Sequence, residues 1–522
     1  MSQGSGIRDQ ESVFLYGPPG VGKSTLGRKL AELLQLPFVD LDEDIAARAE
    51  MPIPKIFSRE GESRFRERET HALFEAISAS PAIISLGGGA LLSHQNRRAA
   101  EDAGQIVCLT ASVETLIARL ADTPDTRPLL AEDREAKLRA LMSERESHYG
   151  SFDLQIPTDN LSPDEILLRI QTAIGHFFPQ AMGTGYRVLI RADGLPQVGA
   201  MVGAQDPRGP LALVSDETVA ALYADRVLNS LTEVGYSPHL ITFSPGEEHK
   251  NLSTLQKLWD SFLDIGLERR GLVLALGGGV TGDMAGFAAA TYMRGIRWAS
   301  LPTTLLAMVD ASLGGKTGVD LPRGKNLVGA FHPPTFVLTD PLTLGTLPQE
   351  ELRSGMAEVV KHGIISDPGL FDLCRDLTGF GNLSGLGEII RRAAAVKIAI
   401  IEQDPYEGNL RAALNLGHTI GHAVEAVSGY QIKHGEGVAI GMVAEAKLAQ
   451  AIGLAEPGLA DEIASVLENL GLETQIPANL DREAMLRVMQ FDKKRADQTI
   501  RFALPVRIGE VKVGVEIPNL SE

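Results

Sequence analysis

Short apolar runs alternate with helix-like patterns over the first third of the chain. Strand-like runs lie at residues 13–16, 38–39 and 82–86, and helical patterns cover residues 25–34 and 163–178. Strands that alternate with helices along a chain are typical of a mostly parallel, doubly wound sheet. This pattern predicts an α/β fold for the N-terminal part.

The rest of the chain begins with the same alternation. Further strand-like runs lie at residues 186–190, 211–216, 272–276, 500–504 and 510–514. Composition and periodicity both change at residues 179–185, which contain proline and glycine and so indicate a linker. We therefore expect a multi-domain α/β protein whose first domain is residues 1–178.

Length and charge limit the possible classes of function. A chain of 522 residues exceeds the usual size of a single core, and its net charge of −18 opposes binding to nucleic acid or to an anionic membrane. We find no apolar run of membrane-spanning length and no apolar signal core. The only cysteines, Cys108 and Cys374, are too few for a disulfide framework or a thiolate metal cluster. We expect a cytoplasmic protein that binds anionic substrates in local basic pockets.

A glycine-rich loop follows the first strand-like run. Residues 17–24 read Gly-Pro-Pro-Gly-Val-Gly-Lys-Ser and lead into a helical pattern. In such a loop the backbone N–H groups surround a phosphate, Lys23 adds positive charge and the Ser24 hydroxyl can bind magnesium. A chance glycine-rich turn is disfavoured by the strand-to-helix setting, so we expect ATP or GTP here.

Polar residues that could bind the phosphoryl acceptor follow the next strands. Asp40 and Asp42 stand after the run at residues 38–39, near where nucleotide and acceptor meet in a doubly wound sheet, although either could simply cap a helix. Three glycines at residues 87–89 would let a small ligand lie against the backbone. For the arginines of this part, surface salt bridges are the competing explanation; they are Arg66, Arg127 and Arg145.

The ordered series Asp-x-Asp, Phe-Arg-x-x-Glu, Gly-Gly-Gly, Arg-Pro-Leu-Leu and Arg-x-x-x-Tyr resembles the shikimate kinases over residues 10–178. The resemblance implies that Asp42 holds and deprotonates the 3-hydroxyl of shikimate. Arg66 and Arg145 would grip its carboxylate. Gly88 and Gly89 would contact its ring hydroxyls. The residues implied for ATP and Mg²⁺ are Gly20, Gly22, Lys23, Ser24, Thr25, Asp40 and the lid residue Arg127, and those implied for catalysis are Asp42, Lys23 and Arg127.

A second concentration of polar residues lies in the C-terminal part. Residues 411–422 read Arg-Ala-Ala-Leu-Asn-Leu-Gly-His-Thr-Ile-Gly-His. If they are helical, His418 and His422 stand one turn apart, and His434 could return from a loop to complete a metal site. Glu358 offers a carboxylate from another helical pattern. Two ordinary helical histidines remain the alternative.

Glycines also follow the strand-like run at residues 272–276. Residues 277–282 read Gly-Gly-Gly-Val-Thr-Gly and lead into an alanine-rich helical pattern. This setting suits the pyrophosphate of a dinucleotide, although a structural turn is a competing interpretation. Asp216 ends an earlier run and could accept hydrogen bonds from a ribose.

Together these residues resemble the 3-dehydroquinate synthases over residues 186–522. The resemblance implies an NAD-binding α/β domain at 186–345 and a mainly helical metal-binding domain at 346–522. Zinc or cobalt would be bound by Glu358, His418 and His434. NAD would be contacted by Asp216, Glu247, Lys250, Gly278, Gly279, Asp283, Thr303, Thr304, Lys316, Lys325 and Thr346. The substrate would be contacted by Arg294, Asp310, Lys316, Asn326, Lys361, Lys397, Arg411, Asn415, His422 and Lys494.

The resemblance also implies chemistry and assembly. NAD would oxidise the C5 hydroxyl of 3-deoxy-arabino-heptulosonate 7-phosphate beside the metal, phosphate would be eliminated, and the reduced cofactor would be reoxidised before ring closure to 3-dehydroquinate. The phosphate and carboxylate charges of the substrate would be neutralised by Lys316, Lys361 and Arg411. His422 would relay a proton. The family places the arginine at the Arg294 position in the neighbouring subunit's site, which implies a homodimer. Thr218 departs from the asparagine that relatives often carry beside NAD.

Two alternatives remain open at this point. One is a kinase for another polyol joined to a metal-dependent alcohol dehydrogenase or a different sugar-phosphate cyclase. The surplus of cations around Lys397 and Arg411 argues against it, because those substrates lack a carboxylate. The other is a catalytically silent assembly or ligand-sensing protein, which the intact candidate residues oppose. The expected protein is a bifunctional enzyme of aromatic amino acid biosynthesis.

Overall fold

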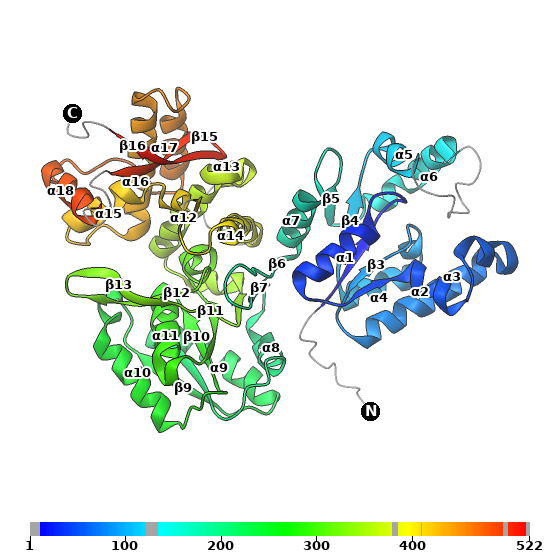
Figure 1. The fold of residues 1–522 in the computed structure, drawn as a ribbon, viewed down its shortest axis with the longest axis horizontal. Helices are drawn as coiled ribbons and strands as arrows, with labels where there is room; N and C mark the ends of the chain where they lie inside the picture. Colours follow the sequence, from blue (N-terminus) through cyan, green and yellow to red (C-terminus); the bar gives the residue numbers. More distant parts are fainter. Residues whose placement is uncertain (1–10, 122–133, 378–384, 409, 494–499, 518–522) are drawn as a thin grey trace. The chain divides into compact units, whose positions relative to one another are not determined.

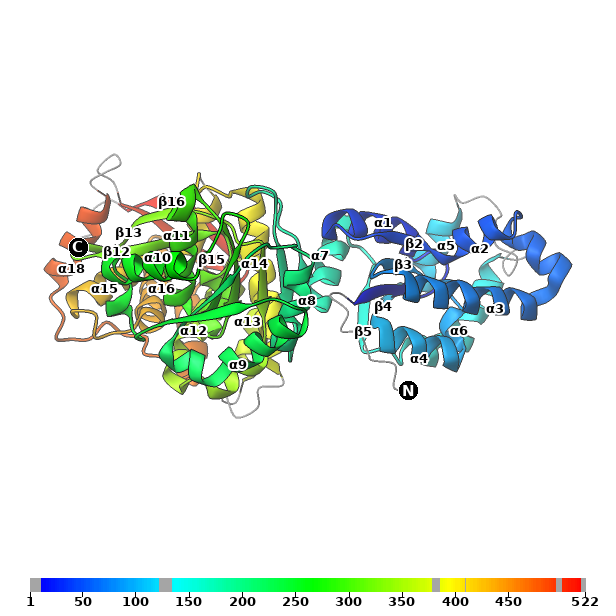
Figure 2. The same cartoon turned by 90° about the horizontal axis from the view of Figure 1, so that it is seen from below.

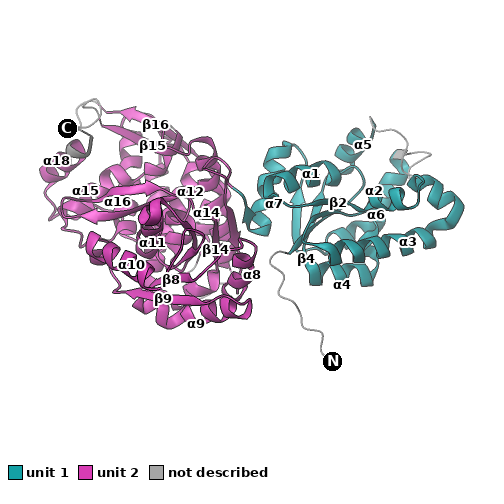
Figure 3. Cartoon of the chain, turned by 60° about the horizontal axis from the view of Figure 1, so that its bottom comes forward, with its two compact units in different colours: residues 1–178 teal, residues 179–522 magenta. Residues whose placement is uncertain are grey.

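The computed structural model describes residues 11–121, 134–377, 385–408, 410–493 and 500–517. The chain divides into two compact units, Met1–Phe178 and Pro179–Glu522 (Figure 3). Each unit has its own sheet and its own apolar cores, so each is described by itself. Among the described helices, none combines the length and apolar character needed to cross a bilayer.

Unit 1 is a five-stranded parallel sheet in the order β2-β3-β1-β4-β5. Its strands are β1 (Ser12–Tyr16), β2 (Phe38–Asp40), β3 (Ile83–Ser85), β4 (Gly104–Thr110) and β5 (Leu154–Pro157), with β6 (His176–Phe177) near the end of the unit. Its helices are α1 (Lys23–Leu34), α2 (Leu41–Arg48), α3 (Ile53–Ala79), α4 (His94–Ala103), α5 (Val113–Ala121), α6 (Arg134–Tyr149) and α7 (Pro163–Ile174).

Alternation along β1 sends neighbouring side chains to opposite faces of this sheet. Val13 and Leu15 join the core formed with α1 and α7, whereas Phe14 and Tyr16 join the core formed with α2, α3 and α4. Figure 2 shows α1 and α4 on opposite sides of the strands. The predicted doubly wound sheet is confirmed, and its carboxyl edge carries the loops that follow β1, β2 and β3.

One predicted helix of unit 1 is shorter than expected. Residues 163–178 were expected to be helical throughout, but α7 ends at Ile174 because Gly175 adopts a left-handed conformation with φ of 66°. The Gly175 N–H donates to the carbonyl oxygens of Gln171 and Thr172, which closes the helix. His176 and Phe177, which follow, form β6 instead.

Unit 2 contains a parallel sheet and a group of helices. The strands of this sheet that lie in unit 2 are, in spatial order, β7 (Arg187–Ile190), β14 (Phe336–Thr339), β11 (Arg297–Pro302), β10 (Leu272–Gly277), β8 (Leu211–Asp216) and β9 (Pro238–Phe243). Their helices are α8 (Val198–Gly203), α9 (Glu217–Glu233), α10 (Leu252–Asp264) and α11 (Gly279–Thr291). An antiparallel ribbon, β12 (Lys316–Leu321) and β13 (Gly324–Phe331), follows a π-helical turn, η6 (Ala307–Ala311).

The C-terminal part of unit 2 is mainly helical, as expected (Figure 1). Its helices are α12 (Gln349–Ser366), α13 (Pro368–Arg375), α14 (Leu386–Gln403), α15 (His418–Val427), α16 (His434–Ala451), α17 (Leu459–Asn469) and α18 (Arg482–Lys493). A hairpin of β15 (Arg501–Arg507) and β16 (Glu510–Glu516) closes the chain and packs on α16 through Phe502 and Leu504.

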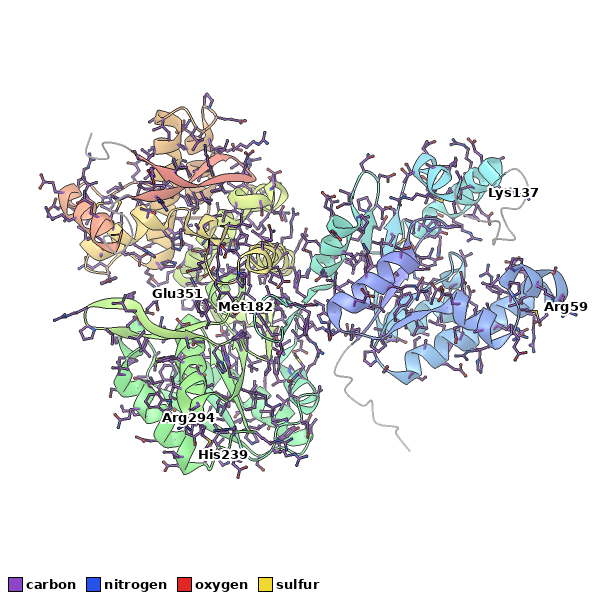
Figure 4. All side chains as sticks on the ribbon, in the orientation of Figure 1. Arg59, Lys137, Met182, His239, Arg294 and Glu351 are labelled. Carbon is purple, nitrogen blue, oxygen red and sulfur yellow. The ribbon has the colours of Figure 1, made fainter. Side chains whose placement is uncertain are left out.

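The first residues of unit 2 are fastened to its helices. Glu402, near the end of α14, accepts hydrogen bonds from the backbone N–H groups of Gln180 and Ala181 at 2.7 and 2.9 Å. Met182 is buried at 1% exposure (Figure 4). Tyr186, also buried, accepts a hydrogen bond from the Gly314 N–H through its hydroxyl. This segment is therefore an ordered part of unit 2.

Candidate active sites

The glycine-rich loop of unit 1 joins β1 to α1. Gly17, Gly20 and Gly22 have φ angles of 130°, 84° and 101°. A Cβ atom on Gly17 would lie 2.2 Å from the carbonyl oxygen of Leu109, so the loop requires glycine there. The loop leads directly into the N-terminus of α1, where backbone N–H groups favour a phosphate.

Three polar residues begin α1. Lys23 Nζ donates hydrogen bonds to the carbonyl oxygens of Gly17 and Pro18 at 2.9 and 3.0 Å, within the loop itself. Ser24 Oγ lies 3.4 Å from Ser85 Oγ at the end of β3, and Thr25 is exposed. These contacts keep the lysine over the loop, where a phosphate would offer it a stronger, charged partner.

The two carboxylates after β2 have different roles in the structure. Asp40 is 8% exposed and caps α2, because its Oδ1 accepts hydrogen bonds from the N–H groups of Asp42 and Glu43. Asp42 instead faces the glycine segment: a Cβ atom on Gly87 would lie 3.1 Å from Asp42 Oδ1. The structure thus brings Asp42, but not the cap Asp40, against residues 87–89.

Arg66 and Glu69, both on α3, also lie against the glycine segment of residues 87–89. Glu69 is 1% exposed and accepts a 2.7 Å hydrogen bond from Arg66, while its Oε1 would lie 2.8 Å from a Cβ on Gly87. Burial raises the pKa of Glu69, and Asp42 raises it further, against the effect of Arg66. Sequence reasoning assigned no role to Glu69, although its spacing of three from Arg66 was a usable signal.

Gly88 and Gly89 lie between the phosphate loop and the arginines. A Cβ atom on Gly88 would lie 3.2 Å from the Gly17 carbonyl oxygen, and one on Gly89 would lie 2.8 Å from Arg66 Nη2. Arg145, on α6, donates a 3.0 Å hydrogen bond to the Gly88 carbonyl oxygen. Arg127 lies outside the described residues. A ligand on these glycines would therefore touch both arginines and the phosphate loop.

In unit 2, the glycines after β10 form the N-terminus of α11. A Cβ atom on Gly278 would lie 3.0 Å from Thr304 Cγ2, so the backbone approaches Thr304 closely. Thr303 is buried, and its Oγ1 has no hydrogen-bond partner among the described residues. Asp216, at the end of β8, caps α9 through the Val219 N–H and accepts a 3.4 Å contact from Thr281 of α11.

A charged cluster lies beside this turn. Lys250 Nζ is 2.6 Å from Asp283 Oδ2 on α11 and donates a 2.6 Å hydrogen bond to Asn326. Burial alone would lower the pKa of Lys250, but Asp283 outweighs it and raises the pKa. Lys325 lies 3.5 Å from Glu247. The structure therefore groups Asn326, which was expected at the substrate, with the residues expected at NAD.

Three candidate metal ligands converge from three helices. Glu358 of α12, His418 of α15 and His434 of α16 each place one ligand atom within 4.8 Å of the others. Glu358 Oε1 lies 3.5 Å from His418 Nε2 and 3.6 Å from His434 Nε2. Glu358 is fully buried, and Oε1 has no hydrogen-bond partner among the described residues, so the donor set fits a divalent cation.

Protonation of the cluster follows from burial and charge. Burial lowers the pKa of His418 well below its usual value, and Lys361 lowers it further, so this imidazole is neutral. Burial also lowers the pKa of His434, but Glu358 and Glu425 outweigh it and raise the pKa to about 10. His434 Nδ1 lies 3.0 Å from Glu425 Oε1. A metal at this site has to replace a proton on His434.

Glycines allow the two histidine helices to touch. A Cβ atom on Gly441 of α16 would lie 1.8 Å from the Gly417 carbonyl oxygen, and one on Gly421 would lie 2.6 Å from that of Gly437. Glu445, fully buried on α16, accepts a 2.6 Å hydrogen bond from the Gly417 N–H, directly before His418. Backbone contact and this carboxylate fix the start of α15, a role that spacing in the sequence does not reveal.

Two more histidines lie near the cluster. The His422 ring is 5.1 Å from that of His418, but His422 is exposed and groups with Glu425 and His434 instead of with Glu358. His362 is fully buried and comes within reach of Asp310 and Glu358. A cation there is disfavoured because Lys397 and Lys361 already pair with those two carboxylates.

Buried cations surround the same region. Lys361 and Arg411 are 2% and 3% exposed, and Lys397 Nζ donates a 2.5 Å hydrogen bond to Asp310 Oδ1. Lys316 pairs with Glu407, whose Oε1 also lies 3.5 Å from Arg411 Nε. Carboxylates inside the chain therefore hold the cations in place, and an anionic ligand could exchange with them.

The turn η6 connects the glycine turn to the metal cluster. A Cβ atom on Gly279 would be in van der Waals contact with Ala311, at 3.4 Å, and the neighbouring Asp310 bonds Lys397 and lies within reach of Glu358. Unit 2 therefore has one candidate site, which combines the Gly277–Gly279 turn, the cluster of Glu358, His418 and His434, and the buried cations.

Four predicted residues lie apart from this place or beyond description. Arg294 is exposed and precedes β11, at the amino ends of the strands, whereas the glycine turn is at their carboxyl ends (Figure 4). Asn415 is exposed at the end of η9 (Leu410–Asn415). Thr346 pairs with the Tyr223 hydroxyl at 2.6 Å. Lys494 lies outside the described residues.

Comparison with known proteins decides the family. The profiles "3-dehydroquinate synthase N-terminal" and "3-dehydroquinate synthase C-terminal" match residues 240–354 and 355–495. The 3-dehydroquinate synthase of Synechococcus sp. strain PCC 6301 is 45% identical over 344 residues, which cover 64% of this chain and 93% of that protein. The chain belongs to the 3-dehydroquinate synthase family.

The N-terminal part adds a second activity to this synthase. The profile "Shikimate kinase" matches residues 19–175. The chain is therefore a bifunctional shikimate-pathway enzyme, with a shikimate kinase in unit 1 and a 3-dehydroquinate synthase in unit 2.

Two solved structures similar to the synthase part contain NAD⁺ and a divalent metal ion. A 2-deoxy-scyllo-inosose synthase complexed with carbaglucose-6-phosphate, NAD⁺ and Co²⁺ is 28% identical with a TM-score of 0.58, covering 66% of this chain and 94% of that one. The 2-epi-5-epi-valiolone synthase of Streptomyces hygroscopicus subsp. jinggangensis 5008, with NAD⁺ and Zn²⁺ bound, is 29% identical with a TM-score of 0.58, covering 64% and 93%.

Proposed function

We propose that unit 2 converts 3-deoxy-arabino-heptulosonate 7-phosphate to 3-dehydroquinate and phosphate, and that unit 1 transfers the γ-phosphate of ATP to the 3-hydroxyl of shikimate. The observation that carries the synthase part is the connection through η6 of the Gly277–Gly279 turn to the cluster of Glu358, His418 and His434. A reaction that uses NAD and a metal on one substrate needs both at one place.

The cofactors are assigned to the residues that fit them. The related structures bind NAD⁺ with Co²⁺ or Zn²⁺, and two imidazoles with one carboxylate suit either ion. NAD supplies a hydride acceptor that returns the hydride, and the metal supplies a Lewis acid. Gly278 and Gly279 would face the pyrophosphate, with the buried Thr303 hydroxyl and Asp216 nearby. The other residues proposed around NAD are Glu247, Lys250, Asp283, Thr304, Lys316, Lys325 and Thr346.

Buried cations favour an anionic substrate with both a phosphate and a carboxylate. Lys361, Lys397 and Arg411 are all less than a tenth exposed, and carboxylates of the chain now hold them. Because cations paired in this way can exchange one anion for another, they would bind the substrate without moving far. Asp310, Lys316, Asn326, Asn415, His422 and Lys494 complete the proposed substrate contacts, and His422 would move a proton at the exposed side.

The kinase site is proposed on the glycines of unit 1. Asp42 would accept the proton of the 3-hydroxyl, Arg66 and Arg145 would hold the carboxylate, and Gly88 and Gly89 would lie under the ring. Lys23 would neutralise charge on the phosphates of ATP, with Mg²⁺ on Ser24 and a water on Asp40. Gly20, Gly22, Thr25 and Arg127 complete the proposed nucleotide contacts.

We further propose a cytoplasmic homodimer. Arg294 lies at the opposite end of the strands from the glycine turn of its own chain, so it can serve a synthase site only in a second copy. Both cysteines are free thiols, as is usual for proteins of a reducing compartment such as the cytoplasm.

One experiment tests both activities on the purified full chain. Metal-free protein is prepared with EDTA, and phosphate release from the heptulosonate phosphate is measured before and after Zn²⁺ or Co²⁺ is restored. Shikimate-dependent ADP formation is measured separately with excess Mg²⁺. The proposal expects metal-dependent phosphate release without net NADH, and ADP formation that requires shikimate. NADH accumulation would indicate a dehydrogenase, and absence of both turnovers would indicate a silent protein.

A further inference from the structure

The carbonyl oxygen of Gly88 receives three side-chain donors. Tyr149 Oη, Arg145 Nη1 and Tyr16 Oη lie 2.7, 3.0 and 3.2 Å from it. A carbonyl oxygen has two lone pairs, so three donors exceed its ordinary capacity. One donor can therefore leave while the carbonyl stays satisfied.

The two tyrosines are held more firmly than the arginine. Tyr16 ends β1 and is fully buried, and Tyr149 ends α6 with 4% exposure. Both rings pack against Phe152 or against each other, with the Tyr16 and Phe152 centroids 5.2 Å apart. Rigid, buried rings place their hydroxyls on Gly88 at little further cost in side-chain entropy.

His148 supports the Tyr16 hydroxyl from the other side. Its Nε2 lies 3.0 Å from Tyr16 Oη. Because a phenol has one proton to donate, Tyr16 can donate to Gly88 and accept from His148 when the ring carries its proton on Nε2. A chain of hydrogen bonds then runs from His148 through Tyr16 to the Gly88 carbonyl.

Arg145 is the donor best able to leave. Its Nε is buried without a hydrogen-bond partner among the described residues, and the carbonyl of Gly88 is a neutral acceptor for a charged group. A carboxylate would offer the guanidinium two parallel, charge-assisted hydrogen bonds. Arg145 therefore has a better partner available than the one it now holds.

We propose that Tyr16 and Tyr149 are positioning residues of the kinase reaction. They keep the Gly88 carbonyl hydrogen-bonded while the guanidinium of Arg145 exchanges that carbonyl for the carboxylate of the acceptor. This inference rests on the proposed binding of shikimate by unit 1. It assigns the tyrosines no contact with the reacting atoms. Their loss affects acceptor binding and leaves phosphoryl transfer itself nearly unchanged.

The test uses Tyr16→Phe and Tyr149→Phe in the full chain. Each is expected to raise the shikimate KM and calorimetric Kd about three- to tenfold, the effect of one lost neutral hydrogen bond. The kcat and the KM for ATP should stay within about twofold of wild type, because the lost hydroxyls bond Gly88, which is proposed to contact shikimate and not ATP. Tyr292→Phe, which removes a buried hydroxyl in unit 2, is the matched control and should change no kinase constant.

An arginine-deleted background separates positioning from general loss of packing. In Arg145→Ala, where no guanidinium can be exchanged, each tyrosine substitution should change shikimate Kd by less than about twofold. Equal effects in both backgrounds, or unchanged Kd and KM in both single variants, would overturn the inference. Failure of wild type to bind shikimate would overturn the proposed function instead, and this inference with it.

Discussion

His434 Nδ1 lies 3.0 Å from Glu425 Oε1, while the other nitrogen of the same ring faces Glu358. A carboxylate behind a metal-binding imidazole fixes the ring and its proton and raises its basicity. We predict that Glu425→Gln weakens metal binding about 10- to 100-fold. Competition with a chromophoric chelator would measure it, with Glu462→Gln as a surface control. Unchanged metal affinity would show that Glu425 does not orient His434.

Asp42 is predicted to be required for the kinase alone. Asp42→Asn keeps the shape of the side chain beside Gly87 but removes the base, so kcat for shikimate phosphorylation should fall at least about 100-fold. Synthase turnover in the same sample should stay at the wild-type level. A coupled ADP assay and a phosphate assay on one preparation would check both. Full kinase activity in this variant would remove Asp42 from its proposed role.

The contact between α15 and α16 predicts a coupled loss of stability and metal binding. In Gly441→Ala the new Cβ would meet the Gly417 carbonyl, 1.8 Å away before any adjustment. Overpacking of this kind costs about 1–3 kcal/mol of unfolding free energy, and the shift would displace His418 from Glu358. Denaturant unfolding and metal titration would measure the two effects. Gly203→Ala, with nothing within 4 Å of the added atom, should change neither.

Each unit contains one buried thiol, which predicts two separate reporters of unfolding. Burial raises the pKa of Cys108 and of Cys374 to about 12, from 9.0 for a free thiol. At pH 8 about one folded thiol in 10,000 is ionised, so a thiol reagent should label neither residue until its unit unfolds. Each thiol has a higher pKa in the folded protein than in the unfolded chain. Its contribution to the free energy of unfolding is therefore present below pH 9 and is lost between pH 9 and 12.

Mass spectrometry after labelling across a denaturant series would follow the two cysteines separately. Labelling of each cysteine should rise at the denaturant concentration at which half of its own unit is unfolded. Rapid labelling of either cysteine in native protein at pH 8 would contradict the burial on which the prediction rests.

The α/β class and both families were predictable because their signals are local. The loop at residues 17–24 and the glycines after residue 276 occur where a strand passes into a helix, and short-range geometry alone produces that arrangement. The end of α7 was mispredicted because apolar residues continue past Gly175, whose left-handed conformation stops the helix. Hydrophobic pattern alone does not register that stop.

The surroundings of the sites were less predictable. Glu425 and Glu445 acquire their contacts only when α15 and α16 pack, and nothing in their spacing distinguishes them from surface carboxylates. The same limit applies to Asn326, which β13 carries to Lys250. The roles of the individual site residues remain predictions for the experiments above.

The anchoring of residues 180–186 has a consequence for anyone dividing this gene. Glu402 holds the backbone of Gln180 and Ala181, and Tyr186 reaches the Gly314 loop beside Arg411. A synthase expressed alone would need its start codon at or before the Pro179 codon. A chain that begins at β7 would lack the backbone N–H groups that Glu402 of α14 binds. It would also lack the side chain of Met182, which is buried in the full protein.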